Sequence, residues 1–130
     1  MAENQNTLAQ HRIMVVEDDQ KIRQLLVDGL ASQGYQVSAA DNGLEALQSI
    51  DTFRPHLCIV DLNMPKIDGL AFLKALRNRP ETSNMPSIVL TAQSDDDNIN
   101  KAMELGAKHF LVKPIRFKLF LNYVRSCLTA

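Results

Sequence analysis

Residues 57–65 read Leu-Cys-Ile-Val-Asp-Leu-Asn-Met-Pro, and this stretch decides the fold class. Its first four residues, Leu57 to Val60, form a short apolar run, which is typical of a strand buried inside a parallel sheet. The run ends in Asp61, and Pro65 and Gly69 then mark a loop before a helical pattern begins. The stretch therefore predicts a buried strand with an acid at its carboxyl end.

Four further apolar runs of similar length predict the remaining strands. They are Ile13 to Val16, Gln36 to Ala39, Ser87 to Thr91 and His109 to Val112. After each run, apolar residues recur every three or four positions, as on one face of an amphipathic helix. Because parallel strands need crossovers and these crossovers are helices, the five strand-and-helix units predict an α/β fold with helices on both faces of the sheet.

Capping residues mark the ends of these helices. Side chains that can accept a hydrogen bond from a free backbone N–H predict the helix starts at Asp19, at Asp41 or Asn42, and at Ser94. Residues 95–97 are all Asp, placed where the helix dipole favours acids. Gly34 and Gly106 predict two helix ends.

The composition describes one folded domain. The chain has 130 residues, of which 45% are hydrophobic and 22% charged, and this balance is typical of globular domains. Its formal net charge of −1 gives no broad attraction to nucleic acid or anionic membranes, so direct binding to either is not expected. No apolar run approaches the ~18 residues of a membrane span.

Residues 1–10 are polar and lack the basic and apolar regions of a secretory signal. They are expected to form a flexible extension of a cytoplasmic protein, with the domain itself over residues 11–130. Cys58 and Cys127 have no metal-binding spacing and are expected to be reduced, buried thiols. The three histidines are scattered along the chain and suggest no metal site.

Chemically active side chains follow the predicted strands. They are Glu17 and Asp18 after the first strand, Asp61 after the third, Thr91 at the end of the fourth, and Lys113 after the fifth. In a parallel α/β sheet these strand ends form the ligand-binding edge. Three carboxylates and one ammonium leave two formal negative charges there. An all-oxygen donor set favours a hard cation such as Mg²⁺ over Zn²⁺.

These strand ends resemble those of the receiver domain of two-component response regulators. The matching motifs are Val15-Val16-Glu17-Asp18-Asp19, Asp61-Leu62-Asn63-Met64-Pro65 with Asp68-Gly69, Leu90-Thr91-Ala92, and Lys113-Pro114. The four motifs occur in the family's order and at its spacing, over about residues 11–128. The resemblance implies a flavodoxin-like doubly wound (βα)₅ sheet with strand order 2-1-3-4-5.

The resemblance also implies a role for each site residue. Asp61 would accept a phosphoryl group from the phosphohistidine of a sensor histidine kinase or a phosphotransfer protein. Asp18 would bind Mg²⁺ directly and Glu17 through water, with Asp61 and the Asn63 backbone carbonyl completing the protein ligands. Lys113 would neutralise phosphate charge, and Thr91 would donate its hydroxyl to a phosphoryl oxygen.

Phe110 occupies the family's switch position, three residues before the lysine. An aromatic ring there turns inward when the threonine moves, and the surface of the fourth helix, fifth strand and fifth helix then regulates a downstream protein. Many members have Tyr at this position. Phe110 lacks the tyrosine hydroxyl, which can form a hydrogen bond with the backbone before and after the movement. A phenylalanine that only fills the core is the alternative.

Three other functions compete with a stand-alone switch. The chain could be a receiver domain cut from a longer regulator with an output domain, or a receiver that has lost phosphorylation. A small phosphohydrolase with Asp61 as nucleophile is the enzymatic alternative. Enzymes of the haloacid dehalogenase type place a second Asp two residues later as general acid, and this chain has Asn63 there.

Overall fold

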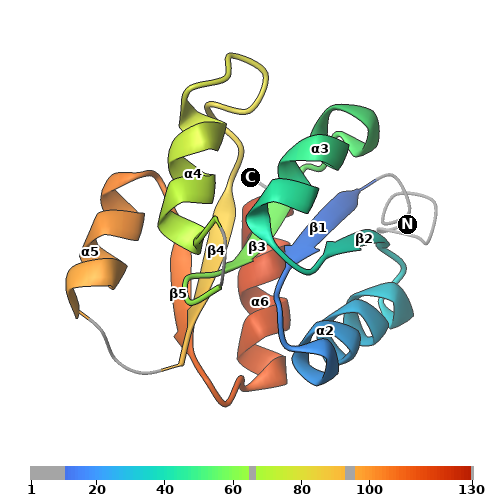
Figure 1. Ribbon diagram of the computed structural model, residues 1–130. Helices are drawn as coiled ribbons and strands as arrows, with labels where there is room; N and C mark the ends of the chain where they lie inside the picture. Colours follow the sequence, from blue (N-terminus) through green and yellow to red (C-terminus); the bar gives the residue numbers. More distant parts are fainter. Residues whose placement is uncertain (1–10, 65–66, 93–95, 130) are drawn as a thin grey trace.

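The computed structural model describes residues 11–64, 67–92 and 96–129, and its strands form one parallel sheet. The five strands are β1 (Arg12–Val16), β2 (Gln36–Ala40), β3 (Leu57–Asp61), β4 (Ser87–Thr91) and β5 (His109–Val112). They lie in the order β2-β1-β3-β4-β5, as Figure 1 shows. The expected flavodoxin-like order 2-1-3-4-5 is confirmed, and each predicted strand is found to within one residue at either end.

Helices cover both faces of this sheet (Figure 1). They are α2 (Gln20–Ser32), α3 (Gly43–Phe53), α4 (Gly69–Arg77), α5 (Asp96–Glu104) and α6 (Phe117–Leu128). Helices α2 and α6 supply one buried cluster, and α3, α4 and α5 supply the other. Among the described residues, no helix has both the length and the apolar character needed to cross a bilayer.

Strand periodicity divides the core between the two faces. Alternate residues of a strand point to opposite sides, so Met14 and Val60 pack with α3, α4 and α5, whereas Ile13 and Ile59 pack with α2 and α6. All residues of the central strands β3 and β4 are buried. The apolar run at residues 57–60 is continuous because both of its faces are covered.

Side-chain caps fix most of the helix starts. Asp19 Oδ1 accepts from the Ile22 N–H at 3.0 Å, and Asn42 Oδ1, rather than Asp41, accepts from the Glu45 N–H at 2.8 Å. Asp68 caps α4 by accepting from the Ala71 N–H at 2.9 Å, a cap that the sequence analysis missed. The predicted cap at Ser94, Asp95 and Pro65 lie outside the described residues, as does the extension over residues 1–10.

The two helix-ending glycines and the two cysteines were predicted with different success. Gly34 and Gly106 follow α2 and α5 with φ of 101° and 92°, a backbone conformation that favours glycine. Both cysteines are free, and Cys58 is buried. Cys127 is only partly buried, contrary to expectation, because it lies near the end of α6 where less of the helix is covered.

Candidate functional site

The carboxyl ends of β1, β3 and β4 meet at one edge of the sheet. Val16 pairs with Val60, and Asp61 pairs with Leu90, so Glu17, Asp61 and Thr91 stand at successive strand ends. The Glu17 N–H still donates to the Ala40 carbonyl at 3.1 Å, which fixes the residue beyond β1. The parallel register thus brings residues distant in sequence to one place.

Three carboxylates converge at this edge. Glu17, Asp18 and Asp61 each offer a carboxylate oxygen, and the three oxygens lie within 4.8 Å of one another. Glu17 and Asp61 are buried, with 0% and 1% of their surface exposed, whereas Asp18 is exposed. The cluster is therefore open to solvent on the side of Asp18, so a hydrated cation could approach it from there.

Lys113 supplies the cation that faces the two buried acids. Its Nζ lies 3.0 Å from Glu17 Oε1 and 3.2 Å from Asp61 Oδ2. The Lys113 N–H donates to the Thr91 carbonyl at 2.8 Å, so the backbone is held to β4 directly after β5. One ammonium group therefore serves two carboxylates, and Asp18 adds a third nearby.

The two buried acids have pKa values shifted in opposite directions. Burial and the hydrogen bond with Asp61 raise the pKa of Glu17 from 4.5 to about 8. Burial also acts to raise the pKa of Asp61, but the hydrogen bonds from Glu17 and the Asn63 N–H, together with Lys113, lower it below its usual value. Near neutral pH the metal-free cluster therefore holds a proton on Glu17, which the formal charge count did not include.

Burial opposes the charge of Lys113, but the hydrogen bond and charge of Glu17 and the charge of Asp61 outweigh it and raise the pKa of Lys113. The ammonium group therefore stays charged throughout the physiological range.

Asn63 connects the acid cluster to the end of β4. Its N–H donates to Asp61 Oδ1 at 3.0 Å. Its side-chain Oδ1 accepts from the Thr91 hydroxyl at 3.4 Å and from the Ala92 N–H at 3.3 Å. The sequence predicted a role for the Asn63 backbone carbonyl but no side-chain contact with Thr91. The side-chain connection had no sequence signal, because it depends on the pairing of β3 with β4.

Two further residues hold the site in place: Arg23, which was not predicted from the sequence, and Gly69, which was named there only as a loop marker and part of a motif. Arg23 of α2 donates from Nη1 to the carbonyl of Glu17 at 2.9 Å and, more weakly, to that of Asp18 at 3.4 Å. Gly69 begins α4 so close to β3 that an added Cβ would lie 2.4 Å from the Asp61 carbonyl oxygen. A side chain at residue 69 would push α4 away from the acid.

Phe110 is 42% exposed on β5, so the alternative of a phenylalanine that only fills the core is wrong. It pairs with Val89, two residues before Thr91 on β4. Side chains two residues apart on a strand share a face, so Phe110 and Thr91 lie on the same side of the sheet. The ring therefore has the placement required for an inward movement toward the threonine.

The histidines are less scattered than expected. The rings of His11 and His56 lie 5.7 Å apart at the amino end of the sheet, because β1 and β3 are neighbours. His56 Nδ1 accepts from the Arg12 N–H at 2.9 Å, so this nitrogen already has a partner. His109 stacks on Tyr123 with ring centroids 4.0 Å apart.

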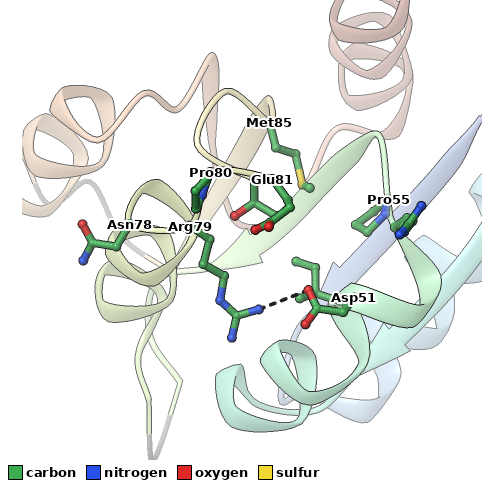
Figure 2. A pocket seen from close by; sticks show the side chains of 10 residues that line it. Asp51, Pro55, Asn78, Arg79, Pro80, Glu81 and Met85 are labelled. Carbon is green, nitrogen blue, oxygen red and sulfur yellow. Dashed lines mark hydrogen bonds and ion pairs between the residues drawn. The ribbon is translucent and has the colours of Figure 1, made fainter.

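A hollow of about 670 Å³ lies away from the acids, between the end of α3 and the loop before β4 (Figure 2). Arg79 and Asp51 form an ion pair across it, with Nη1 and Oδ1 3.5 Å apart. Both residues are substantially exposed, so the pair contributes little to stability. None of the acid-cluster residues lines this hollow.

Comparisons with known proteins agree with the geometry. Residues 13–125 match the response regulator receiver domain family. A probable chemotaxis protein CheY of Rhizobium etli is 38% identical over 104 residues, which are 79% of this chain and 81% of that protein. Response regulator MprA of Mycobacterium ulcerans is 35% identical over 117 residues, 90% of this chain but 50% of its own length. The chain thus spans about half the length of some relatives.

Solved structures show the same fold. Chemotaxis protein CheY4 of Vibrio cholerae has a TM-score of 0.86 and 30% identity, covering 91% of this chain and 98% of its own. Response regulator TrrA of Thermotoga maritima, solved in complex with Mg²⁺ and BeF, has a TM-score of 0.80 and 32% identity, covering 91% of this chain and 99% of its own.

Proposed function

Because this chain belongs to the response regulator receiver domain family of two-component signalling, we propose that it is a switch phosphorylated on Asp61. The observation that carries the proposal is the setting of the Asp61 carboxylate. It is buried, Lys113 Nζ lies 3.2 Å from Oδ2, and the Asn63 N–H donates to Oδ1. A carboxylate held in this way is oriented as a nucleophile and faces a fixed cation.

The phosphoryl donor is a phosphohistidine on a cytoplasmic sensor kinase or phosphotransfer protein. An Asp61 oxygen attacks the phosphorus, the P–O bond forms, and the P–N bond breaks. The electron pair of that bond stays on the histidine nitrogen. Transfer of this kind requires mainly positioning and charge neutralisation, and Lys113 provides both at Asp61.

The residues of the cluster fit Mg²⁺. Their donors are all carboxylate oxygens, and the three acids face the single ammonium group of Lys113. Asp18 and Asp61 would bind the ion directly, Glu17 would act through a water, and the Asn63 carbonyl would complete the protein ligands. Bound Mg²⁺ would supply neutralisation of the phosphoryl oxygens, and Glu17 would give up its proton on binding.

The signal leaves through Thr91 and Phe110. In the structure the Thr91 hydroxyl donates to Asn63 Oδ1. A phosphoryl group on Asp61 offers stronger acceptor oxygens, so Thr91 exchanges partners and moves toward the phosphate. Phe110, half exposed on the same face, then turns inward and alters the surface of α5, β5 and α6, which regulates a downstream protein.

The enzymatic alternative receives no support from the site. A phosphohydrolase needs a general acid two residues after the nucleophile, and Asn63 has an amide whose oxygen already accepts two hydrogen bonds. Receiver domains of this family are signalling switches rather than turnover enzymes. We assign no separate substrate to this chain.

Labelling by acetyl phosphate with Mg²⁺ tests the proposal. We expect one acyl phosphate, labile to both acid and alkali, mapped by peptide mass spectrometry after trapping to the peptide that contains Asp61. Asp51→Asn is the matched control, because Asp51 is exposed and distant from the cluster, and it should label like the wild type. Absence of labelling, or labelling at another residue, would refute Asp61 as the phosphoacceptor.

A further inference from the structure

The exposed acid of the cluster depends on its backbone for its position. Asp18 lies on the short turn that joins β1 to α2 (Figure 1). Glu17 and Asp61 are buried and share Lys113. Within the described part of the chain, no hydrogen bond or ion pair holds the Asp18 carboxylate, yet one of its oxygens lies within 4.8 Å of the other two acids. The direction of the Asp18 side chain is therefore set by the turn that carries it.

Arg23 holds both peptide groups that flank the Asp18 Cα. Its Nη1 donates to the carbonyl of Glu17 at 2.9 Å and to that of Asp18 at 3.4 Å. Because a peptide group is planar, fixing its carbonyl also fixes its N–H. The two planes meet at the Asp18 Cα and together set the direction of its Cβ. One guanidinium group thus orients the acid without touching its carboxylate.

Two other hydrogen bonds fix the same turn, but neither replaces Arg23. The Glu17 N–H donates to the Ala40 carbonyl at 3.1 Å, which holds only the start of the turn. The Asp19 N–H donates to Glu17 Oε2 at 3.1 Å, so this bond depends on a carboxylate of the cluster itself. Arg23 holds the turn from outside the acid cluster, and its bonds are independent of the protonation of the acids.

The charge of Arg23 faces carbonyls rather than a carboxylate. The side chain is partly buried, and no carboxylate of the described residues forms an ion pair with it. A fixed cation near the acids repels a divalent cation that approaches them. The two effects of Arg23 on Mg²⁺ binding therefore have opposite signs. Loss of its charge strengthens binding, whereas loss of its hydrogen bonds releases Asp18 and weakens binding.

We propose that Arg23 is a positioning residue that sets the Mg²⁺ affinity of the acid cluster by orienting Asp18. The inference rests on the proposed function only in taking this cluster as the Mg²⁺ site. Mg²⁺ requires nearly octahedral ligands at ~2 Å, so a small displacement of a direct ligand is costly. Groups that orient metal ligands contribute about 10- to 100-fold in affinity. Arg23 belongs at the lower end of this range, because it acts through the backbone.

Titration of the full, unphosphorylated chain with MgCl₂, followed by backbone NMR, tests the proposal. Arg23→Met keeps most of the side-chain length and removes every donor, and we expect the Kd for Mg²⁺ to rise about tenfold. Lys21→Met is the matched control, since Lys21 is an exposed cation on the same helix without a described bond to the turn. It should bind Mg²⁺ at least as tightly as the wild type. Arg23→Met with wild-type or tighter affinity would overturn the proposal, because charge would then be its main contribution.

Titration with CaCl₂ separates orientation of the ligand from loosening of the whole site. Ca²⁺ accepts about six to eight oxygen ligands in a flexible geometry, so the same displacement of Asp18 should cost it less. We expect Arg23→Met to raise the Kd for Ca²⁺ by no more than about threefold, so the preference for Mg²⁺ falls. Equal losses for the two ions would overturn the positioning role.

Arg77→Met tests whether Mg²⁺ affinity simply follows stability. Arg77 donates to carbonyls and a hydroxyl around the amino end of β4, at the opposite edge of the sheet from the acids. Its loss should destabilise the chain more than Arg23→Met does, and it should leave the Kd for Mg²⁺ within about twofold of wild type. A tenfold rise in Arg77→Met as well would overturn the proposal, since a merely structural role would then explain both variants.

The two proposals fail separately. Metal binding is measured without phosphodonor, and Asp61 labelling is measured on the wild type. Labelling of Asp61 together with unchanged Mg²⁺ affinity in Arg23→Met overturns only the positioning role. Weakened Mg²⁺ binding in Arg23→Met without labelling of Asp61 overturns only the phosphoacceptor.

Discussion

Two sets of charged groups are withdrawn from solvent at opposite edges of the sheet. At the amino end of β4, the Arg77 guanidinium donates to the carbonyls of Leu105, Thr82, Ser83 and Met85 and to the Ser87 hydroxyl. At the carboxyl ends, Glu17 and Asp61 share Lys113. Arg77 has an acceptor for each of its three nitrogens, whereas Glu17 and Asp61 share the single ammonium group of Lys113.

The difference separates a structural group from a functional one. The partners of Arg77 are neutral dipoles from the loop after α4, from β4 and from Leu105 directly after α5, so the cation is satisfied and ties α4 to these three segments. Glu17 of the acid cluster instead has a raised pKa, caused first by burial, so the fold holds an acid whose charged form is disfavoured there. An acid perturbed in this way is expected where a cation or phosphoryl group is to bind.

The largest effect is expected from Arg77→Met, which keeps the side-chain length and removes every donor. Four carbonyls and a hydroxyl lose their partner, and we expect the free energy of unfolding to fall by about 3 kcal/mol, measured by urea denaturation. Arg79→Met is the control: it removes one exposed ion pair and should change stability by less than about 1 kcal/mol. Equal effects of the two variants would contradict the structural role of Arg77.

Lys113→Met should act on both stability and signalling. The metal-free protein should lose about 2 kcal/mol, because the buried acids Glu17 and Asp61 lose the cation that both contact. The variant should still label on Asp61 in the presence of Mg²⁺, but beryllofluoride should not produce the backbone NMR shifts over residues 99–115 that it produces in the wild type. Wild-type shifts in the variant would show that the lysine is not part of the switch.

The pH dependence of stability sharpens the comparison through Glu17. Its pKa is 4.5 when unfolded and about 8 when folded, so between these values the folded chain binds the extra proton and stability falls as pH rises. The slope is at most about 1.4 kcal/mol per pH unit for one proton. Asp61 acts oppositely: its lowered pKa gives stability above about 3.8 that is lost at lower pH.

Thermal melts of the metal-free protein between pH 5 and pH 8 measure this dependence, with ~5 °C corresponding to roughly 1 kcal/mol in a domain of this size. Glu17→Gln should flatten the curve, and Mg²⁺ should stabilise the wild type more at pH 8 than at pH 6, since binding releases the proton. A wild-type curve that is already flat, or one that rises with pH, would show that Glu17 is ionised in the metal-free protein.

The smallest effect is expected from Asn63→Ala. It removes the acceptor of the Thr91 hydroxyl and Ala92 N–H but keeps the backbone N–H on Asp61, so stability should fall by no more than about 1 kcal/mol. Thr91, without this acceptor, should show altered NMR shifts in the absence of phosphodonor, in the direction that beryllofluoride induces. Shifts in the opposite direction would mean that Asn63 does not hold the resting state.

Periodicity and strand-end chemistry predicted a parallel sheet with Glu17, Asp61 and Thr91 at its carboxyl edge. The strand order that makes β1, β3 and β4 neighbours came from the family resemblance, and the structure confirms it. The proton on Glu17, the Asn63 side-chain contacts and the Arg77 hydrogen bonds could not be predicted. They depend on burial and on distances between segments that the sequence does not place.

Labelling of Asp61→Asn by acetyl phosphate tests most directly whether Asp61 is the phosphoacceptor. The variant removes one of three converging carboxylates and keeps the volume. We predict no labelling and a smaller stabilisation by Mg²⁺ than in the wild type. Labelling retained in the variant would contradict the proposal, because another residue would then accept the phosphoryl group.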